Sequence, residues 1–188
     1  MNIILFRGGM VGDLIALMLD KTLLADIDRV EELHSVCAGH VLDPTRSKLK
    51  KFWKYDNHWK FDYLSRCSAN KVMVSHDTEF ALLTPDITVQ IICSDYLLIE
   101  FFAQRFMDLH QRSVIAEVSN AIKSTGHFVA DYTNDIIAWQ EYHQFPTRFD
   151  IKNIKNKSLF LNDVCHQFPD INAGWASDIY TQWHSINC

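Results

Sequence analysis

Residues 2–13, with the sequence NIILFRGGMVGD, decide the class of fold. After its first residue the run NIILF is apolar throughout, which is typical of a strand buried on both faces of a parallel sheet. Three glycines follow within five residues. Asp13 then suits the N-cap or first turn of a helix whose apolar residues recur at helical spacing. The order strand, glycine loop, helix predicts an α/β protein.

The same alternation continues along the chain. Further strands are predicted at residues 71–75 (KVMVS) and 87–93 (ITVQIIC), and an edge strand is predicted at residues 149–154. Alternation of strands with helices indicates a three-layer α/β/α architecture with a central, mostly parallel sheet and a helical C-terminal part. A length of 188 residues favours one domain over residues 1–188. Helices are predicted at residues 96–123, 133–143, 158–168 and 174–185.

Composition excludes several functional classes. The net charge of -5 disfavours nucleic acid as a partner of the whole molecule. No run of 18 apolar residues predicts a membrane span, and the first apolar stretch is too short for a signal peptide. The five cysteines are odd in number and never spaced C-x-x-C, which favours a cytoplasmic protein with reduced thiols. The histidines show no H-E-x-x-H spacing, so no metal site is predicted.

One segment differs in charge from the rest. Residues 44–71 carry eight basic and two acidic residues, a net charge of +6, whereas the rest of the chain carries -11. Lysines alternate there with aromatic residues, a mixture that binds anions and stacks on rings. The simpler interpretation is an amphipathic helix with solvated lysines. Either way, the imbalance favours a small anionic or nucleotide ligand, or an acidic face of a partner, and no membrane partner is predicted.

Three polar loops follow the predicted strands. Ligands of open parallel sheets bind outside the carboxyl ends of the strands, so these loops are the candidate site. They are expected to converge on one crevice. The candidate residues are Arg7, Gly8, Gly9, Met10, Val11, Gly12 and Asp13 in the first loop, His76 in the second and Ser94 in the third.

The first loop has two interpretations. Glycines let backbone amides approach a ligand, and the N-terminus of the following helix favours an anion. However, a Walker A loop needs four residues between its glycines and a Lys after them, whereas three residues separate Gly8 from Gly12. A dinucleotide fingerprint would need glycine at Arg7, and an ionised Asp13 would repel a phosphate. The alternative is a tight turn with close packing.

His76 directly follows a predicted strand. The ordinary pKa of histidine suits proton transfer near neutral pH, so His76 is the candidate catalytic base, with Asp77 as a residue that could orient it. The alternative is a histidine that hydrogen-bonds within its loop.

Residues 71–106 resemble the central part of P-loop sulfotransferases. In that family a strand ends in T-H, an L-P-containing link follows, and the next strand and helix read I-I-Y-x-x-R-N-P-x-D-x-x-x-S-x-x-x-F. Here the strand ends in Ser75-His76, the link reads LLTP at residues 82–85, and IICSD at residues 91–95 leads to Phe106. The resemblance implies a P-loop sulfotransferase-like fold in which His76 deprotonates a hydroxyl acceptor.

The resemblance also implies a cofactor, 3′-phosphoadenylyl sulfate or another nucleotide, cradled by the loop from Gly8 to Asp13. The family's Lys and hydroxyl residues are absent from this loop, and its cofactor-binding Arg and Ser fall at about Ser94 and Phe102. The expected function is therefore transfer of a sulfuryl or phosphoryl group from a nucleotide to a hydroxyl. The alternative is a catalytically inactive protein that binds an anion or nucleotide, or has a regulatory role, on the same fold.

A second, more local resemblance covers residues 3–13. The run RGGMVGD is similar to the R-x-G-x-x-G-D with which heptosyltransferase-like glycosyltransferases open. It implies a third alternative, a small glycosyltransferase-like protein that uses a sugar nucleotide. Those enzymes have two Rossmann-like domains, for which 188 residues are too few.

Overall fold

The computed structural model describes residues 2–20, 72–76, 78–111 and 128–187. Within them, four parallel strands form one sheet in the order β2-β1-β3-β4. The first strand therefore has the second on one side and the third on the other, which makes the gap between β1 and β3 a topological switch point. The strands are β1 (Asn2–Leu5), β2 (Val72–Ser75), β3 (Thr88–Ile92) and β4 (Thr147–Asp150).

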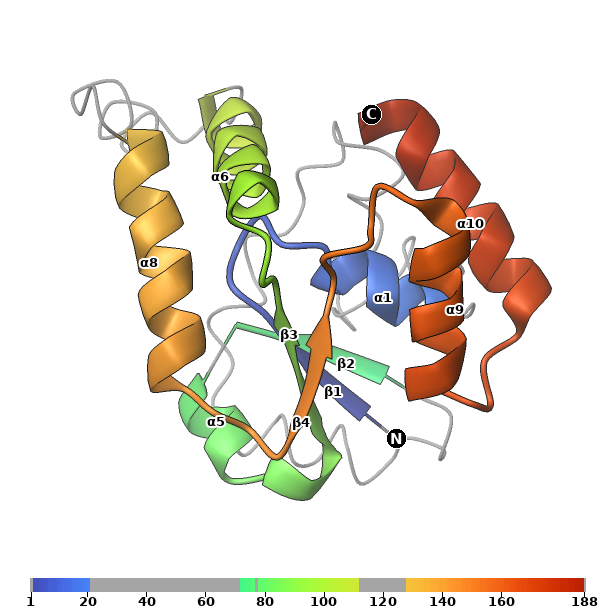
Figure 1. Ribbon diagram of the computed structural model, residues 1–188. Helices are drawn as coiled ribbons and strands as arrows, with labels where there is room; N and C mark the ends of the chain where they lie inside the picture. The colour runs from blue at the N-terminus through green and yellow to red at the C-terminus, as the bar shows by residue number, and fades with distance from the viewer. Residues whose placement is uncertain (1, 21–71, 77, 112–127, 188) are drawn as a thin grey trace.

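Helices cover both faces of this sheet (Figure 1). Helices α5 and α8 lie against one face, and α1, α9 and α10 lie against the other. Helix α6 follows β3 and packs beside α8. The α/β class and the parallel sheet are thus confirmed. The helices are α1 (Gly12–Leu19), α5 (Thr78–Leu82), α6 (Tyr96–Gln111), α8 (Phe128–Tyr142), α9 (Lys157–Gln167) and α10 (Ala173–Asn187), and a short 3₁₀ turn, η3, spans Pro85–Ile87.

Strand β1 is buried on both faces, as its uniform apolar run predicts. Ile3, Ile4 and Leu5 have no exposed surface. Side chains alternate along a strand, so Ile3 and Leu5 pack towards α5 and α8, and Ile4 packs into the larger cluster with α1, α9 and α10. Helix α1 returns over the sheet directly after the glycine loop, and its buried residues include Leu14 and Leu17.

Several boundaries differ from the predicted ones. Helix α8 begins at Phe128, five residues before the predicted start, and the five-residue helix α5 was not predicted. Strand β4 is an edge strand of the described sheet, but it ends at Asp150. Ile151 and Ile154 are instead fully buried in the turn that follows, which accounts for the apolar alternation beyond the strand.

Some predictions fall on residues outside the described part of the chain. These are the basic segment 44–71, Asp77, and the end of the long helix predicted at residues 96–123, which is described to Gln111. Among the described helices, none has both the length and the apolar character needed to cross a membrane.

Candidate functional site

The candidate residues lie at the carboxyl ends of β1, β2 and β3. Because these strands are parallel neighbours, the loops after Leu5, Ser75 and Ile92 leave the same edge of the sheet. The loops after β1 and β2 also contact each other directly, since the amide of Phe6 donates to the carbonyl of Ser75 at 3.1 Å. The fold therefore brings His76 to the base of the glycine loop.

The loop between β1 and α1 turns at Gly9, whose φ of +83° lies in the left-handed region that favours glycine. The amide of Met10 closes the turn by donating to the carbonyl of Arg7 at 3.1 Å. The side chains of Met10 and Val11 are buried in the core, so these two residues offer a ligand only their backbone.

Close packing accounts for the glycines of this loop. A Cβ at Gly8 would lie 2.9 Å from both the Phe106 ring and the hydroxyl of Tyr132. A Cβ at Gly9 would lie 2.7 Å from Cβ of Phe106, and one at Gly12 would lie 2.0 Å from the ring of Phe6. Side chains from α6 and α8 therefore cover the loop on one side, as the tight-turn interpretation expects.

Helix α1 begins without a side-chain cap. Its N-cap residue is Val11, whose side chain has no oxygen to accept a hydrogen bond from the first turn. Within the described residues, the amides of Gly8, Gly9, Val11 and Gly12 donate to no backbone carbonyl. Such amides at a helix start are satisfied by water or by an anion. The backbone therefore retains the donors that anion binding requires.

Asp13 lies in the first turn of α1, in agreement with the sequence prediction. Its Oδ1 is buried and has no hydrogen-bond partner among the described residues. Burial raises the pKa of this carboxyl to about 8, although the charge of Arg105 opposes the shift. At neutral pH Asp13 is therefore mostly protonated, and the repulsion of an anion expected from an ionised Asp13 largely disappears.

His76 is bonded to the strand beside it. Its Nδ1 lies 2.5 Å from the carbonyl oxygen of Phe6, and its ring meets the Phe6 ring edge-on at 4.1 Å between centroids. Burial lowers the pKa of His76 to about 4, and the Arg7 charge contributes in the same direction. The imidazole is therefore neutral, and because a carbonyl only accepts, Nδ1 carries the proton and Nε2 the lone pair.

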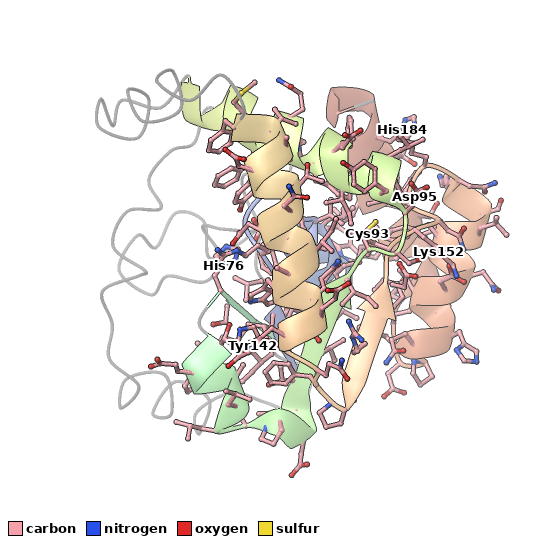
Figure 2. The ribbon with its side chains drawn as sticks, turned by 60° about the vertical axis from the view of Figure 1, so that its left-hand side comes forward. His76, Cys93, Asp95, Tyr142, Lys152 and His184 are labelled. Carbon is pink, nitrogen blue, oxygen red and sulfur yellow. The ribbon has the colours of Figure 1, made fainter. Side chains whose placement is uncertain are left out.

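Ser94 belongs to a different cluster. Its hydroxyl donates to Oδ2 of Asp150 at 2.6 Å, and its amide donates to Oδ1 of the same carboxylate at 3.1 Å. The amide of Lys152 also donates to this Oδ1, at 3.0 Å. Figure 2 shows His76 on one side of α8 and Cys93, Asp95 and Lys152 on the other. No hydrogen bond in the described part joins Ser94 to His76 or to the glycine loop.

Cys93, the residue after β3, is buried. Its amide donates to Oε1 of Gln140 in α8 at 2.5 Å, and Nε2 of Gln140 donates back to its carbonyl at 3.3 Å. Burial raises the pKa of the Cys93 thiol to about 12, so the residue is an unreactive part of the core.

Arg7 and the glycine loop have partners that the sequence does not reveal. Nε of Arg7 donates to Oδ2 of Asp135 at 2.8 Å, and the hydroxyl of Tyr132 donates to the carbonyl of Gly8 at 2.8 Å. Both partners come from α8, more than 120 residues later in the chain. No sequence motif signals these contacts. They place one cation beside loop amides that, within the described residues, donate to no backbone carbonyl.

The residues around this loop fit an oxyanion better than they fit the whole cofactor of the sulfotransferases. Arg7 and the loop amides are suitable donors for a phosphate or sulfate group. At the positions where the resemblance puts that family's cofactor-binding Arg and Ser, however, Ser94 is bonded to a carboxylate and Phe102 is fully buried. Within the described residues, no group of three or more His, Cys, Asp or Glu side chains is arranged to hold a metal ion.

The described residues define the chain as an α/β protein with a four-stranded parallel sheet, whose candidate site lies at the carboxyl ends of the strands. No protein-family model, curated protein or solved structure matches it. Anything more specific than this class is therefore a proposal that depends on the geometry of the site.

Proposed function

We propose that this chain binds the phosphate or sulfate group of a small anionic ligand, such as a nucleotide, on the loop from Arg7 to Asp13. The observation that carries the proposal is the start of α1. The helix begins at the switch point of the sheet, without a side-chain cap, and with loop amides that donate to no backbone carbonyl in the described part. Ligands of open α/β sheets bind at this point.

Local charge supports the proposal despite the net charge of -5 for the chain. Arg7 is a permanent cation, and protonation of Asp13 removes the nearest negative charge from the first turn of α1. The helix dipole adds a partial positive charge at the same place. An oxyanion at this edge is therefore attracted by Arg7 and by the helix dipole, and the neutral Asp13 does not oppose them.

Binding is tested by following thermal unfolding of the full chain with inorganic phosphate, inorganic sulfate, ATP, adenosine 3′,5′-bisphosphate and a sugar nucleotide. A ligand present at 100 times its Kd stabilises the folded state by about 2.7 kcal/mol. We expect at least one of these ligands to stabilise the chain and Arg7→Gln to remove most of the effect.

Arg148→Gln is the matched control, because Arg148 is an exposed arginine whose Nη2 donates to the carbonyl of Gln140, away from the loop. This variant should respond to the ligands as the unmodified chain does. A chain that none of these ligands stabilises would contradict the proposal. Stabilisation by sugar nucleotides alone would favour a glycosyltransferase-like protein.

A second candidate function, group transfer, is favoured by the geometry of His76. The bond from Nδ1 to Phe6 fixes the tautomer in which Nε2 is the basic nitrogen of the ring. In this mechanism Nε2 takes the proton of an acceptor hydroxyl. The acceptor oxygen bonds to the sulfur or phosphorus, and the bridging bond of the nucleotide donor breaks, so that its oxygen leaves with the electron pair. The low pKa of His76 makes it a weak base, which favours binding without transfer.

Transfer is tested by incubating the full chain with labelled donor nucleotides, 3′-phosphoadenylyl sulfate among them, and a panel of hydroxyl acceptors. If His76 is the base, His76→Ala should lose about 100-fold or more in kcat, because a general base contributes on that scale. His143→Ala is the control and should retain full turnover. The His143 ring lies edge-on to the Tyr142 ring at the end of α8. Equal turnover by His76→Ala would exclude His76 from the reaction, and binding without turnover would indicate an inactive binding protein.

A further inference from the structure

The guanidinium of Arg7 is held from one side only. Its Nε donates to Oδ2 of Asp135 at 2.8 Å, and the two side chains are 38% and 42% exposed. Among the described residues, Nε is the only nitrogen of this guanidinium with a hydrogen-bond acceptor. Within the described part of the chain, the two Nη groups therefore have no acceptor, and the edge of the guanidinium that they form together is not used by Asp135.

This arrangement leaves the groups that bind oxyanions best. A guanidinium has five N–H donors in one plane, and one of them is on Nε. With Nε bonded to Asp135, four donors on Nη1 and Nη2 remain. Pairs of parallel N–H groups recognise phosphate and sulfate in a bidentate manner.

Helix α8 fixes the loop and the arginine together. One turn before Asp135, the hydroxyl of Tyr132 donates to the carbonyl of Gly8, the residue after Arg7. The Tyr132 ring stacks on Phe106 of α6, with 4.6 Å between centroids and 14° between planes. The hydrogen bond to Asp135 is also the main reason why the pKa of Arg7 is raised above its ordinary value. The backbone and side chain of this segment are thus tied to one turn of a packed helix.

We propose that Asp135 is a positioning residue, which accepts the Nε–H of Arg7 and so presents the two Nη groups of Arg7 to a tetrahedral oxyanion. This inference rests on the proposed anion binding and assigns the class of group that Arg7 recognises. Asp135 acts through Arg7 and does not touch the ligand. What matters is its acceptor oxygen rather than its charge, because the negative charge of Asp135 itself repels an oxyanion that Arg7 holds.

The two roles of Asp135, acceptor and charge, are separated by two variants. Asp135→Asn keeps a side-chain oxygen that accepts from Nε, whereas Asp135→Ala removes it. The full chain is titrated with inorganic phosphate and with inorganic sulfate by calorimetry. We expect Asp135→Ala to bind about tenfold more weakly, and Asp135→Asn to remain within about threefold of the unmodified chain. Arg7→Lys keeps the charge without the bidentate donors and should also lose about tenfold.

Each outcome bears on the inference in a defined way. If the unmodified chain binds phosphate or sulfate, and Asp135→Ala binds it equally or more tightly, the inference is wrong while the proposed function stands. If Asp135→Asn binds as weakly as Asp135→Ala, the acceptor is not the feature that matters, and the inference is again wrong. If the unmodified chain binds neither anion, the proposed function and the inference both fail. A variant that did not fold would be recognised by its thermal unfolding, and Arg7→Lys would then decide the outcome.

Discussion

Replacement of Gly12 by alanine should destabilise the fold by about 2 to 4 kcal/mol, one of the two largest effects that we expect from a single substitution. A Cβ at this position would lie 2.0 Å from Cδ1 of Phe6 and 2.2 Å from its Cγ. Phe6 has little room to move, because it is 2% exposed and its ring packs edge-on against His76. Either α1 or the end of β1 must therefore shift. The free energy of unfolding of the purified variant is measured by urea unfolding.

Gly174→Ala is the matched control for this prediction. Gly174 lies in the first turn of α10, and the nearest atom to its added Cβ is Oδ1 of Asn172, at 3.4 Å. Alanine is the better helix former, so this variant should be as stable as the unmodified chain or slightly more so. If the two alanine variants unfold at the same urea concentration, the close contact between Gly12 and Phe6 is not a feature of the molecule in solution.

Asp13→Asn should stabilise the fold by about 5 kcal/mol at pH 8 and have little effect at pH 4. The pKa of Asp13 is raised by burial from 3.8 to about 8, so between these values the folded state binds a proton that the unfolded state has lost. The free energy of unfolding therefore falls as the pH rises through this window. One pKa unit corresponds to about 1.4 kcal/mol, and the asparagine removes this dependence.

His76 produces a slope of the opposite sign that the Asp13→Asn variant should reveal. Its pKa is lowered from 6.5 to about 4, so the unfolded state binds the extra proton between these values, and stability rises with pH there. In Asp13→Asn the free energy of unfolding should increase from pH 4 to 6.5 and then stay level to pH 8. The control is Asp131→Asn, in an exposed residue of the first turn of α8, which should leave the pH dependence of the unmodified chain in place. An Asp13→Asn variant that is less stable than the unmodified chain at pH 8 would contradict a buried, protonated Asp13.

The sequence predicts the sheet better than the lengths of the helices. A uniform apolar run such as NIILF is long enough only for a short buried strand, and all three of its central residues are fully buried. The sequence predicts the start of α8 too late because its first residues, Phe128 and Val129, do not continue a clear helical pattern. The five residues of α5 are too few for a periodic pattern to emerge, although its Phe80 is fully buried.

The candidate site could be predicted only where its residues are neighbours in sequence. The turn at Gly9 and the position of Asp13 in the first turn of α1 follow from local backbone preferences. The partners of Arg7 and Ser94 do not, since Asp135 lies 128 residues from the first and Asp150 lies 56 residues from the second. Which side chains meet at that separation is decided by packing of whole helices and strands.

The central claim is that the first turn of α1 and the loop before it bind an oxyanion. The most direct measurement is a titration of the uniformly ¹⁵N-labelled full chain with inorganic phosphate and inorganic sulfate, followed by amide chemical shifts. We predict saturable shifts that are largest at the amides of Gly9, Gly12 and Asp13 and that are lost in Arg7→Gln. Saturable shifts confined to residues away from this loop, or no saturable shift at all, would contradict the account.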